Sequence, residues 1–265
     1  MANEADHRLA HDLATQAGNL LLDLRTRLLA DGVEASAIGA QGDSIAHDLL
    51  VGRLAEERPD DAVLSEESSD IDRADRSRLS AKRVWIIDPL DGTREFREGR
   101  TDWAVHVALV ENQIPTAGAV AVPALDALEP PDVDASSTRT DPPLRIVVSR
   151  TRPPWFAAAV ADAIGATLEP MGSAGAKTMA VVRGDAEVYL HAGGLNEWDA
   201  CAPAAVALEA GLHVSHIDGS PILFNQADTS TGDLLICRTE LAATILAAIG
   251  DAESTGPDEV SGATG

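Results

Sequence analysis

The sequence predicts an α/β protein whose single chain forms two abutting halves. In the second half, short apolar runs alternate with alanine-rich segments, an order typical of helices packed on a sheet. In the first half, two long helical segments precede a series of short apolar runs. The stretch 125–143, rich in Pro, Asp and Ser, is expected to be the loop between the halves. At 265 residues, 45% of them apolar, the chain is long enough to bury one large core or two abutting ones.

The N-terminal half, residues 1–124, is predicted to begin with helices and to continue with strands. Apolar residues recur at helical spacing over 5–31 and stop at a "DG" pair. A second helix is expected to begin within "GDSIAHDLLVGRLAEE", where Asp43 or Ser44 can serve as its N-cap. The strands expected after it are "AVLS", "RVWII", "WAVHVALV" and "TAGAVAV", the last two joined by a hairpin at "ENQIP".

The C-terminal half, residues 144–250, is predicted to alternate between strands and helices. The expected strands are "RIVVS", "TLEPM", "AEVYLH" and "LLICR". The expected helices are "WFAAAVADAI", "AGAKTMAVVRG", "WDACAPAAVALEAG" and "ELAATILAAI". The tail 251–265 contains too few apolar residues to pack and is expected to be disordered.

Composition restricts the classes of function. A formal net charge of −23 argues against a nucleic-acid polymer as partner, because such binding depends on Lys and Arg displacing counterions, but it does not argue against a small phosphorylated substrate. No stretch reaches the roughly 20 apolar residues that a membrane span needs, and the N-terminus carries charges where a secretory signal would be apolar, so we expect a cytoplasmic protein without a membrane partner. Cys201 and Cys237 have no metal-binding or disulfide spacing and are expected to be small core residues.

Two carboxylates stand at the end of a predicted buried strand, in "WIIDPLDGTREF". The apolar run 84–87 suits such a strand, and Pro89 removes a backbone donor, so we expect the ladder to stop there. Asp88 and Asp91 should therefore leave the sheet together. Close carboxylates repel one another unless they are protonated or bridged by cations, and Mg²⁺ prefers oxygen ligands. The pair therefore indicates a metal site.

The residues after this pair favour a phosphate ligand. Gly92 lets the backbone approach a ligand closely, and Thr93 can open a helix whose free N–H groups face an anion. An Asx-type turn that caps a helix explains the same residues without any ligand and stays open at this point.

Two further acidic segments follow the same pattern. Glu66 and Glu67 end the strand "AVLS", and Asp199 lies at the start of a helix in "NEWDACAPAAVALEAG". Each segment alone can be an exposed acidic turn. Together with Asp88 and Asp91, these acidic ends are typical of a two- or three-metal site for phosphoryl transfer.

The motifs "EE", "DPLDGT" and "WD", in that order, resemble those of the inositol monophosphatase superfamily of Mg²⁺-dependent, lithium-sensitive phosphatases, from roughly residue 8 to residue 250. "DGTREF" and "EWD" are most similar to its bacterial nucleotide-phosphatase branch, the CysQ-like enzymes. The resemblance implies a layered α/β/α/β/α sugar-phosphatase sandwich with the site between its halves. It also implies two or three Mg²⁺ per site as cofactors.

The resemblance further assigns roles to individual residues. One Mg²⁺ would be held by Glu66, Asp88 and the backbone carbonyl of Leu90, a second by Asp88, Asp91 and Asp199, and a third, weaker one would share Glu66. A hydrogen-bonded pair of Thr93 and Asp43, with Glu66, would orient and deprotonate the attacking water. Asp43 lies 23 positions before Glu66, a spacing similar to that of the family. Its other interpretation, a helix N-cap, stays open.

The resemblance implies hydrolysis of the 3′-phosphate of 3′-phosphoadenosine 5′-phosphate (PAP) to AMP and phosphate, a reaction of sulfur metabolism. Asp91 and the backbone amides of Gly92 and Thr93 would contact the phosphate group that is transferred. Where inositol monophosphatases carry a glutamate seven residues before the "WD" aspartate, this chain has Ala192, which counts against inositol phosphates. "GSAGAK" resembles the segment that holds the second phosphate, which would involve Gly172, Ser173 and Lys177. A solvated lysine at a helix end is the other interpretation of Lys177.

Three functions stay open from the sequence. The favoured one is a 3′(2′),5′-bisphosphate nucleotidase acting on PAP, and the nearest alternative is inositol monophosphatase or fructose 1,6-bisphosphatase activity. An idle acidic protein that only chelates cations is less favoured, because a chelator needs neither Thr93 nor the phosphate-facing Gly92. In "VVSRTRPP" the chain has Thr151 and Arg152 where the family often has a histidine, which leaves the nucleoside contacts open. The choice between monomer and homodimer also stays open.

Overall fold

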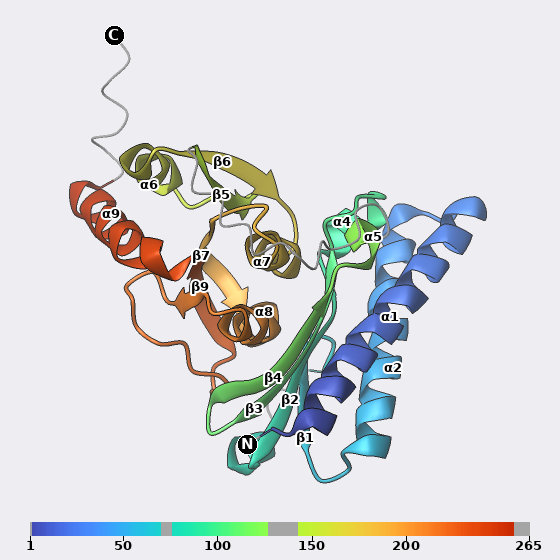
Figure 1. Ribbon diagram of the computed structural model, residues 1–265. Helices are drawn as coiled ribbons and strands as arrows, with labels where there is room; N and C mark the ends of the chain where they lie inside the picture. Colours follow the sequence, from blue (N-terminus) through green and yellow to red (C-terminus); the bar gives the residue numbers. More distant parts are fainter. Residues whose placement is uncertain (1, 70–75, 127–142, 257–265) are drawn as a thin grey trace.

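The computed structural model describes residues 2–69, 76–126 and 143–256. Figure 1 shows two halves, each built on one sheet, with the long N-terminal helices on one side of the molecule. Most of the predicted loop 125–143 and the end of the predicted tail lie outside the described residues. None of the helices in the described ranges is long and apolar enough to cross a membrane.

The first sheet has the strand order β1-β2-β3-β4. Its strands are β1 (Ala62–Ser65), β2 (Arg83–Asp91), β3 (Ala104–Glu111) and β4 (Ile114–Ala121). β1 runs parallel to β2, and the other pairs are antiparallel. The predicted hairpin between β3 and β4 is confirmed: Asn112 and Gln113 form its turn with φ of 52° and 67°, the left-handed values that two-residue hairpin turns require.

The second sheet has the strand order β6-β5-β7-β9-β8. Its strands are β5 (Leu144–Ser149), β6 (Ala166–Met171), β7 (Val188–Asn196), β8 (His213–Ser215) and β9 (Ser230–Cys237). β5 is parallel to both β6 and β7, and β9 is antiparallel to its neighbours β7 and β8. The four strands predicted for this half are confirmed, and β8 is an addition that the sequence pattern did not reveal.

The helices are α1 (Glu4–Ala30), α2 (Ala35–Glu57), α4 (Thr93–Arg97), α5 (Pro123–Asp126), α6 (Ala157–Ile164), α7 (Ala174–Val182), α8 (Glu197–Glu209) and α9 (Ala242–Thr255), with short 3₁₀ turns η1 (Arg76–Ser80) and η2 (Thr239–Leu241). α9 runs past the predicted start of the tail at residue 251, so the expectation of disorder is wrong for 251–255. Ala252 explains the extension, because it is buried against the core beneath α9.

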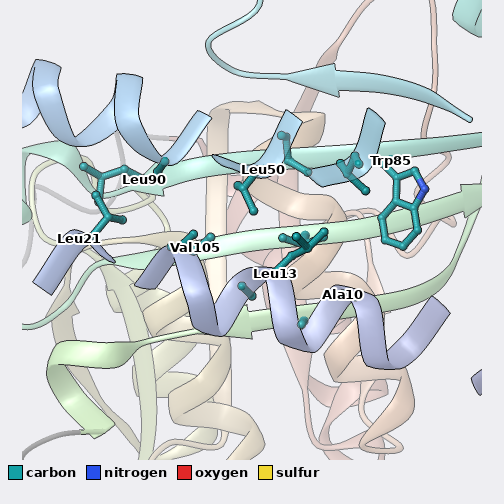
Figure 2. Packing of buried hydrophobic residues seen from close by; sticks show 14 of the residues in the cluster. Ala10, Leu13, Leu21, Leu50, Trp85, Leu90 and Val105 are labelled. Atoms are coloured by element: carbon teal, nitrogen blue, oxygen red, sulfur yellow. The ribbon is translucent and has the colours of Figure 1, made fainter. Parts of the chain in front are cut away.

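Side chains alternate between the two faces of each strand, and this alternation defines the layers. On β2, Trp85 faces the long helices and shares a core with Leu13 of α1 and Leu50 of α2 (Figure 2). The next residue, Ile86, belongs to a second core that contains Cys201 of α8. The first sheet is therefore covered by α1 and α2 on one face and by α8 on the other.

The second sheet is covered in the same way. Tyr189 of β7 joins the core around α8, whereas the adjacent Leu190 packs with Val160 of α6 and Ile245 of α9. Figure 1 shows the resulting order, with α7 and α8 between the sheets and α6 and α9 on the far side. The predicted α/β/α/β/α sandwich is confirmed, and both cysteines are buried core residues as expected.

Helix α2 begins earlier than predicted, at Ala35, so Asp43 lies inside the helix and is not its N-cap. Gly39 and Gly42 lie in the first part of α2 and explain why the sequence pattern did not indicate its start. A glycine in a helix interior is unfavourable by about 1 kcal/mol. A Cβ on Gly39 would lie 2.9 Å from Thr93, and one on Gly42 would lie 2.9 Å from Leu90. The glycines therefore let α2 pack closely against the end of β2 and the start of α4.

The β2 ladder does not stop at Pro89 as predicted. Asp88 lies opposite His106 of β3, and after a register shift Asp91 lies opposite Ala104. The shift places one extra residue on β2, which is the arrangement of a β-bulge. The bulge accommodates the missing proline N–H and lets the strand continue to Asp91.

A partly buried ion-pair network around the buried Asp6 joins the N-terminus of α1 to the start of β2. Arg83 donates to both carboxylate oxygens of Asp6, with Nη2 2.8 Å from Oδ1 and Nη1 3.3 Å from Oδ2. Arg58 Nε donates to the same carboxylate at 3.1 Å, and the Asn3 N–H donates at 3.0 Å. Burial alone would raise the pKa of Asp6, but these donors outweigh it and lower the pKa to about 2.

We predict that Asp6→Asn destabilises the fold at neutral pH. Because the pKa of Asp6 in the folded chain is about 2, below the ordinary 3.8, its stabilisation is fully present above pH 3.8 and is lost as pH falls toward 2. The lost charge should cost roughly 2 kcal/mol of unfolding free energy at pH 7. Urea unfolding at pH 7 and at pH 2.5 measures this, with exposed Asp48→Asn as the control. An equal loss at both pH values would contradict the assignment.

Candidate active site

Four carboxylates from three elements meet where the two halves face each other. Asp88, Asp91 and Asp199 each offer an oxygen within 4.8 Å of the others'. Glu66, just after β1, lies so close to Asp88 that, besides burial, its charge raises the pKa of that carboxyl. β1 and β2 are parallel neighbours, so their carboxyl ends meet at one edge of the sheet, and α8 brings Asp199 to that edge. The structure thus brings the predicted acidic residues together.

Asp88 shows that the cluster suits a cation. Its Oδ1 accepts a hydrogen bond from the Leu90 N–H at 3.0 Å, but its buried Oδ2 has no hydrogen-bond partner among the described residues. Burial, and then the charges of Glu66, Asp91 and Asp199, raise the pKa of Asp88 well above its ordinary value. A buried carboxylate oxygen without a donor is costly. Mg²⁺, which prefers carboxylate oxygens, would satisfy it, so the residues fit the metal that the motifs imply.

Asp91 is held by donors from two elements. Its Oδ2 accepts from Ser173 Oγ at 2.5 Å and from the Gly175 N–H at 2.8 Å, and His106 Nε2 lies 3.2 Å away as an ion-pair partner. Burial by itself would raise the pKa of Asp91, but His106, Lys177 and Ser173 outweigh it and lower the pKa to about 2. Asp91 is therefore charged at neutral pH.

Glu66 and Asp199 respond to the crowding in the opposite way. Burial and the charges of Asp199 and Asp91 raise the pKa of Glu66 to about 7. Burial and the charge of Asp91 raise the pKa of Asp199 to about 6, although the Asn196 N–H donates to its Oδ2 at 2.7 Å. That bond closes the capping box of α8, so Asp199 is fixed by the start of its own helix.

Asp43 and Thr93 form the predicted pair. Thr93 Oγ1 lies 3.2 Å from Asp43 Oδ1 and 3.2 Å from the Leu90 carbonyl oxygen. Burial, and then the charge of Glu67, raise the pKa of Asp43 to about 6, against the effect of the Thr93 hydrogen bond. The hydroxyl of Thr93 thus connects a carboxylate on α2 to the bulged end of β2.

Lys177 is buried, with 3% of its surface exposed, so its interpretation as a solvated helix-end residue is wrong. Its Nζ donates to the Gly172 and Ser173 carbonyls and lies 5.0 Å from the centre of the Tyr189 ring. Burial lowers the pKa of Lys177 to about 8, although the charge of Asp91 opposes this shift.

These groups line one cavity of about 400 Å³ between the halves. Glu66, Asp91 and Asp199 form its acidic side, with Gly92, Thr93, Gly172 and Ser173 also in its wall. Asp88 is buried beneath this acidic side. Arginines 94, 150 and 152, together with Tyr189 and His191, line it as well, and motif reasoning assigned none of them. The one sequence signal for Arg150 and Arg152 is their position directly after the predicted strand "RIVVS", where side chains can reach the end of the sheet.

Arg150 links the two halves beside this cavity. Its Nη1 donates to Glu95 of α4 at 2.9 Å, and its Nη2 pairs with Asp102. Asp102 in turn accepts from the Gly172 N–H at 2.7 Å. No ion pair of Arg152 appears among the described residues, and its guanidinium lies so close to Gly194 that a Cβ there would be 3.2 Å from Nη1. Arg152 therefore offers the cavity a cation that no carboxylate of the described chain neutralises.

The layered fold and the acidic cavity are those of a metal-dependent sugar phosphatase. The model of the inositol monophosphatase family matches residues 3–130 and 134–253, and the chain belongs to this family. It is 47% identical over 262 residues to the 3′-phosphoadenosine 5′-phosphate phosphatase of Mycobacterium leprae, covering 94% of each protein. It is 31% identical to the 3′(2′),5′-bisphosphate nucleotidase CysQ of Escherichia coli strain K12, over 68% of this chain and 76% of that protein.

Solved structures agree with this assignment. CysQ from Bacteroides thetaiotaomicron superimposes with a TM-score of 0.70 at 25% identity, over 89% of this chain and 98% of that one. An inositol monophosphatase from Anabaena superimposes with a TM-score of 0.69 at 19% identity, over 94% of this chain and 96% of that one, a likeness in fold alone. The family predicted from the motifs is therefore confirmed.

We predict that Asp88→Asn removes nearly all phosphatase activity at limiting Mg²⁺. Its side chain is nearly isosteric, so the loss would come from the missing charge beside Glu66, Asp91 and Asp199. A Mg²⁺ titration of phosphate release measures this, with Asp48→Asn, on the exposed side of α2, as the control. Wild-type turnover of Asp88→Asn at limiting Mg²⁺ would show that Asp88 is not a metal ligand.

We also predict that Mg²⁺ stabilises the protein more at pH 8 than at pH 5. The pKa values of Glu66 and Asp199, about 7 and about 6, are raised above their ordinary 4.5 and 3.8. The folded metal-free chain therefore keeps protons that the unfolded chain releases, and its stability falls as pH rises from 3.8 toward 7. Mg²⁺ binds the deprotonated carboxylates and reverses this loss. Thermal melts in EDTA and in Mg²⁺ at both pH values test this, and equal Tm increases would contradict it.

Proposed function

We propose that this protein is a Mg²⁺-dependent phosphatase that hydrolyses the 3′-phosphate of PAP to give AMP and inorganic phosphate. The observation that carries the proposal is the cavity, in which a carboxylate cluster and the cations Lys177 and Arg152 line the same space. The relatives named as PAP phosphatase and bisphosphate nucleotidase support the same reaction, because they match the chain over most of its length.

The carboxylates divide into two overlapping ligand sets. Glu66, Asp88 and the Leu90 carbonyl would hold one Mg²⁺, and Asp88, Asp91 and Asp199 would hold a second. Glu66 would also be a ligand of a third, weaker Mg²⁺. Bound Mg²⁺ would neutralise charge on the phosphate and lower the pKa of a water. Asp88 Oδ2, which has no hydrogen-bond partner within the described ranges, supports the place of Asp88 in both sets.

The chain's own groups supply positioning and proton transfer. Asp43 accepts from Thr93, and its raised pKa of about 6 suits a group that exchanges a proton near neutral pH. We assign Thr93, Asp43 and Glu66 to orienting the attacking water and receiving its proton. The amides of Gly92 and Thr93, at the turn between β2 and α4, would donate to oxygens of the transferred phosphate.

The second phosphate of PAP requires a cation, since the net charge of −23 repels anions from the protein. We assign this role to Lys177, supported by Gly172 and Ser173 beside it. Lys177 is buried in the cavity wall, where a low dielectric strengthens its attraction for a phosphate. The hydroxyl of Ser173 already donates to Asp91, so we do not assign it a direct hydrogen bond to the substrate. Ser173 would instead act through its backbone carbonyl, which holds the ammonium group of Lys177.

A panel of substrates tests the proposed reaction. We expect phosphate release from PAP in Mg²⁺ to exceed that from inositol 1-phosphate and fructose 1,6-bisphosphate by at least roughly tenfold in kcat/KM, the loss that one unsatisfied charged contact produces. A preference for either sugar phosphate would overturn the substrate assignment. No turnover of any of them would favour a protein that only chelates cations.

Lys177→Met tests the substrate assignment at one residue. Methionine keeps most of the buried volume, so removal of the charge should lower kcat/KM for PAP by roughly tenfold to a hundredfold through KM. Turnover of inositol 1-phosphate should change far less, because it has no second phosphate. Lys82→Met, at the other and exposed lysine, is the matched control. Equal losses on both substrates would mean that Lys177 supports the fold or the metal site instead.

A further inference from the structure

His106 is a buried histidine that the proposed reaction does not use. It lies on β3 with 0% of its surface exposed, directly opposite Asp88 in the sheet. Its Nδ1 is 3.0 Å from the carbonyl oxygen of Trp198, and its Nε2 is 3.2 Å from Oδ2 of Asp91. The ring therefore stands between the end of β2 and the first turn of α8.

We propose that His106 is a positioning residue that holds Asp91 and the α8 terminus carrying Asp199 in their metal-binding arrangement. The proposal rests on the proposed function only in requiring that the carboxylate cluster binds a divalent cation. It does not depend on which phosphate ester is cleaved.

The chemistry of the two partners defines what the ring does. Nδ1 donates to the carbonyl oxygen of Trp198, whereas Nε2 contacts Asp91 as an ion pair and has no hydrogen-bond partner among the described residues. The contact with Trp198 acts one residue before Asp199, at the backbone of α8. One side chain thus restrains two carboxylates that come from different halves of the fold.

The contact with Asp91 also selects which oxygen is available to a cation. Oδ2 accepts hydrogen bonds from Ser173 Oγ and the Gly175 N–H, the two that one carboxylate oxygen ordinarily accepts, and His106 Nε2 adds an ion pair 3.2 Å away. Oδ1 accepts no hydrogen bond from the described residues, so it is the oxygen that remains for a cation. Donors of this kind fix the orientation of a ligand and are commonly worth about tenfold to a hundredfold in metal affinity.

The packing around His106 is built to make room for the ring. A Cβ on Gly175 would lie 2.3 Å from His106 Nε2 and 2.7 Å from the Ala104 side chain. Only a glycine permits α7 to approach His106 and Asp91 this closely. Gly175 therefore contributes to the same positioning of Asp91 and His106, and this is a physical reason for the second glycine in "GSAGAK".

The test is metal binding by His106→Leu and His106→Gln in the full chain, with Mn²⁺ as the probe. Binding is measured by electron paramagnetic resonance of free Mn²⁺, without substrate, at a temperature where each variant is folded by circular dichroism. We expect His106→Leu to weaken Mn²⁺ affinity by about tenfold to a hundredfold. His106→Gln should recover part of this loss, because its amide can donate. Saturating Mg²⁺ should restore most of the kcat of either variant.

His213→Gln is the matched control, since His213 lies on β8 and contacts Ser215. Its Mn²⁺ affinity should equal that of the wild type. A merely structural role for His106 would lower Tm and leave the Mn²⁺ affinity of the folded variants unchanged, and that result would overturn the proposal. If His106→Leu does not fold, wild-type affinity in His106→Gln together with no loss in Gly175→Ala would overturn it. A wild-type protein that binds no Mn²⁺ would instead refute the proposed metal-dependent function, and this inference with it.

Discussion

The repulsion between carboxylates held close together in a buried space is the constraint on which this structure depends. Glu66, Asp88, Asp91 and Asp199 lie within one cluster at the junction of the two halves. Two of them, Asp88 and Asp91, are buried and the other two are half-buried, so water screens their charges only in part. The protein compensates only part of this charge, chiefly at Asp91, through hydrogen bonds from the start of α7 and an ion pair with His106 of β3. The rest results in raised pKa values of Glu66, Asp88 and Asp199, and in an oxygen of Asp88 that has no hydrogen-bond partner in the described part of the chain. A fold that tolerates such a cluster must be stabilised elsewhere, and it is suited to cations.

Close approach between the layers is what allows the cluster to form, and glycines make it possible. Gly39 and Gly42 let α2 reach the bulged end of β2, which brings Asp43 to Thr93. On the other side of the cavity, a Cβ on Gly172 would lie 2.4 Å from the side chain of Glu95. Glycines are usually unfavourable inside helices, so the presence of Gly39 and Gly42 inside α2 indicates that backbone proximity outweighs helix propensity there.

Arginine pairs hold the halves and the termini of the elements in place despite the strongly negative charge. Arg83 ties Asp6 of α1 to the start of β2, far from the cavity. Arg150 ties α4 and Asp102 to the end of β5, at the rim of the cavity. Lys177 and Arg152 differ from these, because the former donates only to backbone carbonyls and the latter has no ion pair in the described part of the chain. The cavity is therefore lined by three cations that form no ion pair in the described part of the chain, Arg94, Arg152 and Lys177.

The sequence by itself determined the alternation of strands and helices, the family, and the acidic residues of the site, because apolar periodicity and a strand end followed by carboxylates are local signals. Only the tertiary structure decided the start of α2, since contacts of Gly39 and Gly42 with Thr93 and Leu90 outweigh a local preference against glycine. The same holds for the bulge that carries β2 past Pro89 and for the burial of Lys177. The sequence pattern did not indicate a role for His106, because it is a single polar residue within an otherwise apolar predicted strand. Its role arises from partners 15 or more positions away, Asp91 before it and Trp198 after it, which only the folded chain brings to its two ring nitrogens.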